Sequence, residues 1–166
     1  MGCNNITTLH FDKIESCYNY SFKNMAGLTT IVFPKWRKDN YQGFMNDSLL
    51  QYFDIGTAGR TVSGNFTAGE CFRGCSSLNV IILRDANVRG LSGTNVFTNT
   101  PFANGGTGGA VYIPKSLYDH LGDGTPSDYK AASNWSTIDG YGTITWAKIE
   151  GSYYETHYAD GTAVPT

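Results

Sequence analysis

The chain has 166 residues, of which 16% are charged, 14% are aromatic and 20 are glycine, and its formal net charge is −2. This length suits one domain, and the composition favours a loop-rich, mostly β protein over a helical or disordered one. The charge balance and the lack of a basic run argue against nucleic-acid binding, and no apolar run is long enough to span a bilayer. The opening MGCNNITTLHF enters a strand-like pattern at once, which favours an excised fragment or a protein exported without a cleaved signal.

Internal repetition organises the chain from residue 4 to residue 114. Three units share a phenylalanine followed by apolar residues at offsets of 6, 9 and 11: Phe22 with Leu28, Ile31 and Phe33; Phe44 with Leu50, Phe53 and Ile55; and Phe72 with Leu78, Ile81 and Leu83. A truncated copy at the front has Ile6, Leu9 and Phe11, and a stretched copy runs from Phe97 to Val111 and Ile113. The insertion at 57–69 and the glycine-rich stretch at 102–110 lengthen the sequence of the units that contain them.

These spacings predict one short strand per unit. Offsets 9 and 11 are two residues apart, so their side chains point to the same side of a strand and into the core. Repeats of 20 to 29 residues with an L-x-x-L-x-L spacing are the mark of leucine-rich repeats, which stack into a solenoid. We therefore expect a leucine-rich-repeat solenoid, mostly β or α/β, with short parallel strands joined by irregular or 3₁₀ segments.

The segment Phe72-x-x-Cys75-Ser-Ser-Leu78-x-x-Ile81 resembles the BspA-like leucine-rich repeats of bacteria. The resemblance continues in Val111-Tyr112-Ile113-Pro114 and in Tyr129-Lys130-Ala131-Ala132-x-x-Trp135, a pair of motifs that closes such arrays in proteins of gut bacteria and their phages. It covers about residues 4 to 150, with Met25 and Asp47 in place of the family's cysteine. The resemblance implies a surface-exposed role as a bacterial adhesin module or as a phage fibre or decoration protein.

We expect a single domain over 1–166, with repeat units at 4–114, a C-terminal cap at 115–150 and a tail at 151–166. Residues 115–121 and 126–135 read as two short helices of the cap, with Tyr129, Ala132 and Trp135 at helical spacing. Such a cap is needed because the last repeat of a solenoid otherwise exposes its core. Residues 144–151 alternate in the manner of a last strand, whereas the aromatic tail has no evident place in the fold.

The strand positions that alternate with the core predict a binding face. We expect an apolar and aromatic patch there, flanked by charge, which is typical of a contact surface for a protein or a glycan. The candidate binding residues are Val32, Tyr52, Asp54, Val80, Ile82 and Tyr112. Two readings without binding remain open: β-branched and aromatic residues suit strands in any case, and inserted loops could cover the face.

Catalytic and metal-binding patterns are not evident. The chain lacks the GxSxG, HExxH and GxxxxGK[ST] motifs, and Cys3, Cys17, Cys71 and Cys75 do not have zinc-ligand spacing. We expect no enzyme, no cofactor and no metal, and we interpret Cys71 and Cys75 as packing thiols. The expected function is non-enzymatic recognition or structure. We expect the protein to lie outside the cell, on a cell surface or on a virion. The expected partner is a protein or a host-surface glycan, and the chain could be part of an oligomeric assembly. The alternative is a carbohydrate-binding module that stacks sugars on Tyr52 and Tyr112.

Overall fold

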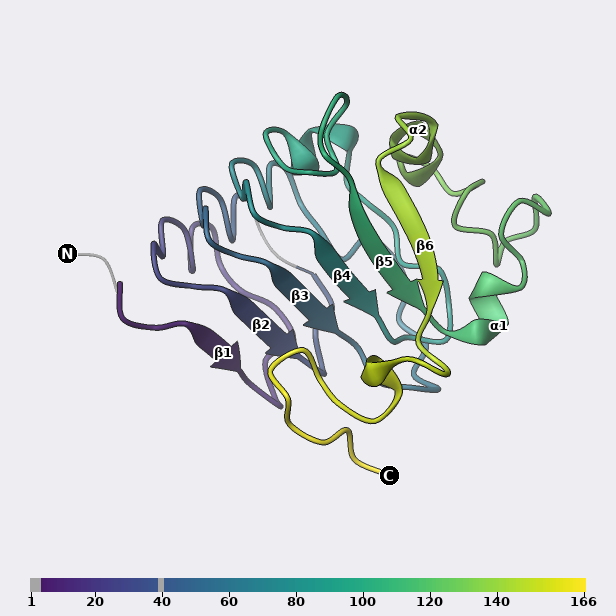
Figure 1. Ribbon diagram of the computed structural model, residues 1–166, viewed down its shortest axis with the longest axis horizontal. Coiled ribbons are helices and arrows are strands. Elements are labelled where there is room, and N and C mark those ends of the chain that lie inside the picture. Colours follow the sequence, from purple (N-terminus) through teal and green to yellow (C-terminus); the bar gives the residue numbers. More distant parts are fainter. Residues whose placement is uncertain (1–3, 39–40) are drawn as a thin grey trace.

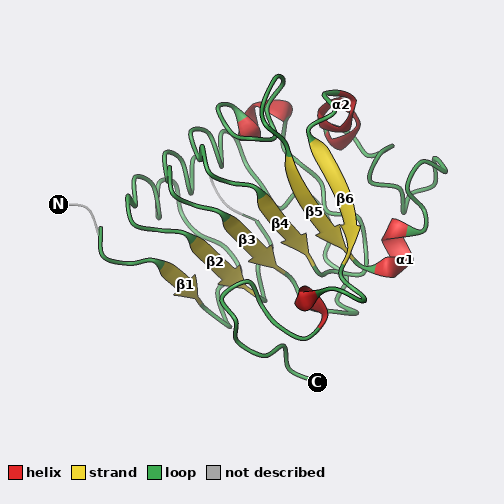
Figure 2. Cartoon of the chain, viewed as in Figure 1, coloured by secondary structure: helices red, strands yellow, loops and turns green. Residues whose placement is uncertain are grey.

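The computed structural model describes residues 4–38 and 41–166 and contains one six-stranded sheet (Figure 1). All neighbouring strands are parallel, and their order in the sheet is their order in the chain. The strands are β1 (Thr8–His10), β2 (Thr30–Phe33), β3 (Tyr52–Ile55), β4 (Val80–Leu83), β5 (Gly109–Ile113) and β6 (Ile144–Lys148). Each connection runs back along one side of the sheet, and most of it is irregular (Figure 2). The arrangement is an all-parallel open sheet with few helices, compatible with a mostly β, solenoid-like fold.

The register of the sheet matches the spacing of the sequence units. Thr8 pairs with Thr30, Thr30 with Tyr52, Tyr52 with Val80, and Val80 with Ala110. The insertion at 57–69 increases the number of residues between equivalent positions of β3 and β4. It does not change how these strands pair, because it leaves the sheet after β3 and returns before β4. The predicted assignment of alternate strand positions to opposite sides of the sheet is confirmed.

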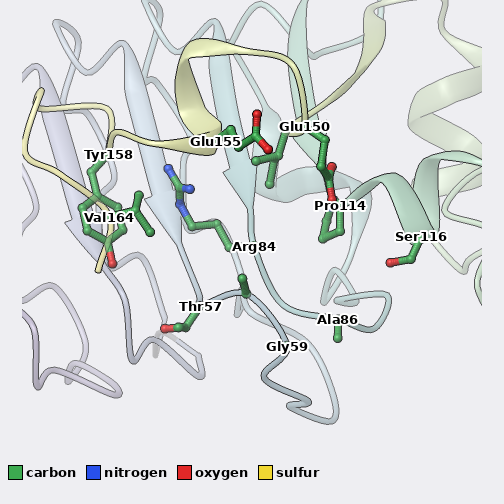
Figure 3. Close-up of a pocket in the computed structure, with 12 residues that line it drawn as sticks. Thr57, Gly59, Arg84, Ala86, Pro114, Ser116, Glu150, Glu155, Tyr158 and Val164 are labelled. Carbon is green, nitrogen blue, oxygen red and sulfur yellow. The ribbon is translucent and has the colours of Figure 1, made fainter. Parts of the chain in front are cut away.

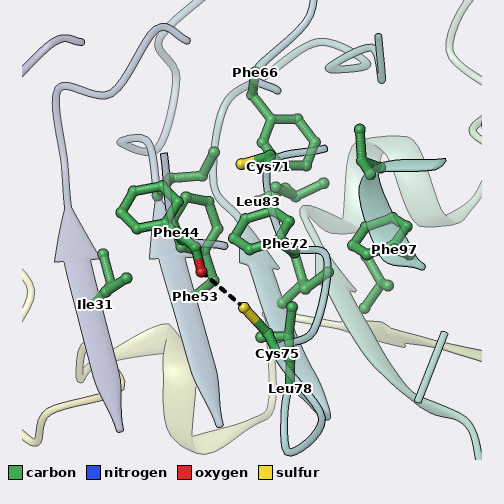
Figure 4. Close-up of a cluster of buried hydrophobic side chains, with 14 of the residues drawn as sticks. Ile31, Phe44, Phe53, Phe66, Cys71, Phe72, Cys75, Leu78, Leu83 and Phe97 are labelled. Atoms are coloured by element: carbon green, nitrogen blue, oxygen red, sulfur yellow. Dashed lines mark hydrogen bonds between the residues drawn. The ribbon is translucent and has the colours of Figure 1, made fainter. Parts of the chain in front are cut away.

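A column of stacked phenylalanine rings forms the wall of the core opposite the sheet (Figure 4). Phe22, Phe44, Phe72 and Phe97 lie with consecutive ring centroids 5.5, 5.7 and 5.8 Å apart and interplanar angles of 4°, 11° and 7°. Each unit therefore places its leading phenylalanine directly over that of the next unit. Stacked aromatic pairs contribute about 0.5–1.5 kcal/mol each beyond the burial of their area.

The apolar positions at offsets 6, 9 and 11 are buried in every inner unit. For the unit that begins at Phe72, the exposed fractions of Phe72, Leu78, Ile81 and Leu83 are at most 1%. Cys71 and Cys75 are buried in the same core, and the Cys75 thiol donates a hydrogen bond to the carbonyl oxygen of Phe44 at 3.0 Å. Burial raises the pKa of the Cys75 thiol above its ordinary value, so this sulfur stays protonated.

The turn that precedes each strand needs a left-handed backbone residue. Asn24, Asn46 and Gly74 occupy equivalent places and have φ values of 62°, 65° and 79°. Asparagine tolerates this region better than other side chains do, and glycine enters it without cost. At Gly74 a Cβ atom would lie 2.5 Å from Oδ1 of Asn46, so a side chain there would require the Asn46 side chain to move.

The C-terminal part closes one end of the core. It contains the helices α1 (Lys115–Tyr118) and α2 (Trp135–Gly140), in addition to two 3₁₀ helices elsewhere, at Thr94–Phe97 and Tyr153–Glu155. Tyr129 and Trp135 are fully buried, and the Trp135 indole N–H donates to the carbonyl oxygen of Arg89 at 2.8 Å. These two side chains cover the core beyond β5, as expected of a cap.

The helix expected over 126–135 is absent, and helix α2 begins only at Trp135. Asn134 explains why no helix runs into Trp135, because its φ of 66° lies in the left-handed region, which a right-handed helix cannot contain. Before it the chain forms turns, in which the Asp128 carboxylate accepts hydrogen bonds from the backbone N–H groups of Gly124 at 3.0 Å and Lys130 at 2.8 Å. The spacing of Tyr129 and Trp135 thus predicted correctly that both are buried, but the helix inferred from the same spacing was wrong.

Candidate binding surfaces

The six predicted binding residues lie on neighbouring strands and on one side of the sheet, as their register requires. The expectation that they form an exposed patch is wrong. Val32, Asp54 and Ile82 have an exposed fraction of 0%, and Tyr52, Val80 and Tyr112 are half-buried. A segment of the chain therefore covers this face of the sheet.

The cover is the C-terminal segment 151–166, which runs along the carboxyl ends of the strands (Figure 1). Arg84 fixes it from the end of β4. Its guanidinium donates to both carboxylate oxygens of Asp54, at 2.6 and 2.8 Å, and to the carbonyl oxygens of Tyr154 at 2.7 Å and His157 at 3.0 Å. Asp54 also accepts the backbone N–H of Ala159 at 2.9 Å. The buried ion pair thus joins two strands and the C-terminal segment into one network.

Aromatic contacts complete the cover. The Tyr154 ring packs edge-on against Tyr112 with 4.7 Å between centroids, and Tyr158 lies 4.8 Å from the Arg84 guanidinium. At the far side, His10 on β1 contacts Oδ2 of Asp160 through Nδ1 at 2.6 Å. Burial raises the pKa of Asp160, but hydrogen bonds from Thr162 and His10 outweigh it, and the pKa is lowered overall. Tyr112 therefore has a ring of the C-terminal segment as its neighbour.

A cavity of about 370 Å³ opens between the C-terminal segment and the carboxyl ends of β3, β4 and β5 (Figure 3). Its floor and one wall come from residues that directly follow these strands, and its other wall comes from residues 149–164. The lining is formed by Thr57, Ala58, Gly59, Arg84, Ala86, Pro114, Ser116, Ile149, Glu150, Glu155, Tyr158 and Val164.

The N-terminal end of the sheet is a second candidate surface. Ile6 is 38% exposed and Phe11 is 41% exposed, although the residues at the same offsets in the inner units are buried. Tyr18 and Tyr20 of the same unit are also exposed, and the Tyr20 ring packs edge-on against Tyr41 at 6.0 Å. Within the described residues, strand β1 pairs only with β2, so its other edge is not paired.

The buried carboxylates of Asp54 and Asp85 have structural partners. Asp85 accepts hydrogen bonds from Arg60, at 2.8 Å to Nε, and from the buried Arg89. Burial raises the pKa of Asp54, and the hydrogen bonds and charge of Arg84 oppose this rise. Each of these groups is occupied by another protein group, and no described residues form a cluster of three or more His, Cys, Asp or Glu side chains that could hold a metal ion.

Sequence reasoning missed the residues that shape the cavity. Arg84 and Asp54 carried a usable signal, because opposite charges on neighbouring strands in an otherwise apolar ladder predict an ion pair. Glu150, Glu155 and Tyr158 carried none, since nothing in their spacing placed the C-terminal segment across the sheet. Cys3 lies outside the described residues.

Comparison with protein-family models, curated proteins and solved structures gives no match for this chain. None of the helices in the described part of the chain is long and apolar enough to cross a membrane.

Proposed function

We propose that this protein is a leucine-rich-repeat solenoid with a non-enzymatic recognition role, displayed on a bacterial surface or a virion, and that it binds a strand of a partner protein at its N-terminal end. The observation that carries the proposal is the exposure of Ile6 and Phe11 at repeat positions where every inner unit is buried. The C-terminal segment lies against the sheet face where binding was expected, and Val32, Asp54 and Ile82 on that face are buried.

The inner units indicate what fits this end. The edge of β2 that faces β1 is equivalent to the free edge of β1. The first unit covers that edge of β2 with Ile6, Leu9 and Phe11. Backbone hydrogen bonds fix the contact: the N–H groups of Thr29 and Thr30 donate to the carbonyl oxygen of Thr7 at 2.8 and 3.1 Å. A partner strand with the same apolar spacing can therefore add to β1 by main-chain pairing and fill the apolar positions, as in recognition by strand addition.

The charges around this end fit a protein contact. Asp12, Lys13 and Glu15 follow β1 and are exposed, so both signs surround the apolar positions. An apolar centre with a polar rim is the usual composition of a specific protein interface. An unpaired strand edge with exposed apolar side chains is otherwise an aggregation hazard, which favours the presence of a partner.

The test uses a fluorescein-labelled peptide with the sequence of residues 4–14, because this segment covers the equivalent edge of β2. We expect saturable binding by fluorescence anisotropy, with a dissociation constant of roughly 1 µM to 1 mM. A control peptide has serine at the positions of Ile6, Leu9 and Phe11 and should not bind.

The protein variants are Ile6→Lys and Phe11→Glu, which place charge in the contact and should abolish binding. Leu49→Lys is the matched control, because Leu49 is also an exposed apolar residue but belongs to an inner unit. Failure of the wild-type protein to bind the peptide, or equal binding by Phe11→Glu, would overturn the proposal.

A further inference from the structure

The cavity beneath the C-terminal segment is lined by both apolar and acidic side chains. Ala86, Pro114, Ile149 and Val164 supply apolar walls, and Glu150 and Glu155 supply carboxylates. Figure 3 shows the two glutamates on the part of the chain that leaves β6 and enters the C-terminal segment. A half-buried apolar site with a few placed polar groups is the usual form of a ligand site.

Both carboxylates are held in place by the backbone. Oε2 of Glu150 accepts the N–H of Lys115 at 2.6 Å, and Oε2 of Glu155 accepts the N–H of Gly151 at 3.0 Å. Each glutamate thus uses one oxygen to fix its position, and the other oxygen has no hydrogen bond from a described residue. The side chains are exposed enough to meet a ligand without losing these anchors.

The nearby cations do not balance these two charges. The guanidinium of Arg84 is taken up by Asp54 and by the carbonyl oxygens of Tyr154 and His157. Lys115 pairs with Asp119, and Arg60 pairs with Asp85. The cavity therefore keeps an excess of negative charge beside apolar walls.

We propose that this cavity binds a lysine or arginine side chain of a partner protein. The aliphatic stem lies against Ile149, Val164 and Pro114, and the cationic head meets Glu150 and Glu155. Long basic side chains bury their methylene groups in this way while the charge stays at a polar rim. The site is separate from the N-terminal end, so it goes beyond the function proposed above and does not depend on it.

The experiment is a titration followed by ¹H–¹⁵N correlation spectra of the full chain with three probes. Two are the Nα-acetyl, N-methylamide derivatives of lysine and arginine, and the third is the same derivative of norleucine, which has the stem without the charge. We expect saturable shifts at the amides of Thr57, Ile149 and Gly151 for at least one basic probe. Norleucine should bind about tenfold more weakly, which corresponds to about 1.4 kcal/mol.

Glu150→Gln and Glu155→Gln keep an oxygen for the backbone N–H groups and remove the charge, so the fold should survive. Each should weaken binding of the basic probe severalfold, whereas Glu15→Gln, on the first repeat unit, should not. Phe11→Glu should also bind the probe normally, which separates this site from the N-terminal end. The proposal is overturned if norleucine binds as well as both basic probes, if neither basic probe binds, or if both glutamine variants bind like the wild type.

Discussion

The two ends of the sheet carry the same kind of strand but meet different surroundings. At the N-terminal end, Ile6 and Phe11 keep large exposed fractions, and the described residues do not cover them. At the C-terminal end, the segment between β5 and β6 places Tyr129 and Trp135 over the core, and both are fully buried. One end therefore has the surface of an incomplete repeat, and the other has been closed by residues that follow no repeat.

The difference teaches where the stability of such an array resides. A repeat unit gains its burial from both neighbours, so a terminal unit with one neighbour loses part of its stabilisation. The C-terminal end recovers it through large aromatic side chains and the N-terminal end does not. The first unit should therefore be the least stable part of the sheet, and this contrast can be measured by substitution.

The largest expected effect is for Trp135→Ala. This change removes a buried indole, its hydrogen bond to Arg89 and its contacts with Phe97 and Trp146, at 6.1 and 5.6 Å between centroids. We expect the free energy of unfolding to fall by about 3–5 kcal/mol in urea titrations. Phe11→Ala, at the open end, should cost about 1 kcal/mol or less because its ring is already partly in water. Equal losses in the two variants would show that the ends do not differ.

The next effect concerns the C-terminal segment rather than the core. Arg84→Met leaves the buried Asp54 carboxylate with only the N–H of Ala159, and it releases the carbonyl oxygens of Tyr154 and His157. Breaking a buried ion pair from one side costs about 3–5 kcal/mol, and we expect about 3 here. Hydrogen exchange should become faster in residues 152–162, while strands β4 and β5 remain protected.

Two controls sharpen this result. Arg73→Met removes a pair with Glu70 in which the Arg73 side chain is 43% exposed, and it should change stability by less than about 1 kcal/mol. The double variant Arg84→Met with Asp54→Leu removes both charges and should regain part of the loss, because an apolar pair can replace a buried ion pair. If Arg84→Met left exchange in residues 152–162 unchanged, the ion pair would not be what holds the segment.

How far the sequence predicted this structure depends on the kind of interaction. The strand positions and their register follow from apolar residues at offsets 6, 9 and 11, because burial on one side of a strand allows only one register. The observed pairs agree with this spacing, from Thr8 opposite Thr30 to Val80 opposite Ala110. The repeat also located the phenylalanine column, since each of the four units that begin with phenylalanine supplies one ring.

The candidate sites were predicted less well, because they depend on contacts between distant segments. The exposure of Ile82 could not be judged from its strand, as the residues that cover the sheet face lie in the segment 151–166. The ion pair of Asp54 and Arg84 was visible in the ladder but was read as the flank of a binding patch. For the cavity, the positions of Glu150 and Glu155 depend on single hydrogen bonds to backbone N–H groups, which leave no periodic trace in a sequence.

The smallest expected effect concerns whether water reaches the buried core between the two ends of the sheet. Asp47 occupies the position of Cys75 one unit earlier and is fully buried, and its Oδ1 accepts the N–H of Met25 at 2.7 Å. Its Oδ2 has no hydrogen-bond partner among the described residues. Burial raises the pKa of Asp47 from 3.8 to about 8, against the opposing effect of its backbone hydrogen bonds. The carboxyl group is therefore protonated in the folded protein at pH 6, whereas in the unfolded chain it is ionised.

Because the folded state holds this proton between pH 4 and pH 8 and the unfolded state does not, the contribution of Asp47 to stability falls as the pH rises through that range. We expect wild type to lose about 2 kcal/mol relative to Asp47→Asn between pH 5 and pH 6.5, measured by urea unfolding at each pH. Glu15→Gln, which changes an exposed acid at the open end, should keep the wild-type slope. Parallel pH profiles for wild type and Asp47→Asn would mean that water reaches this position, and the interior would then be closed less tightly than the C-terminal end.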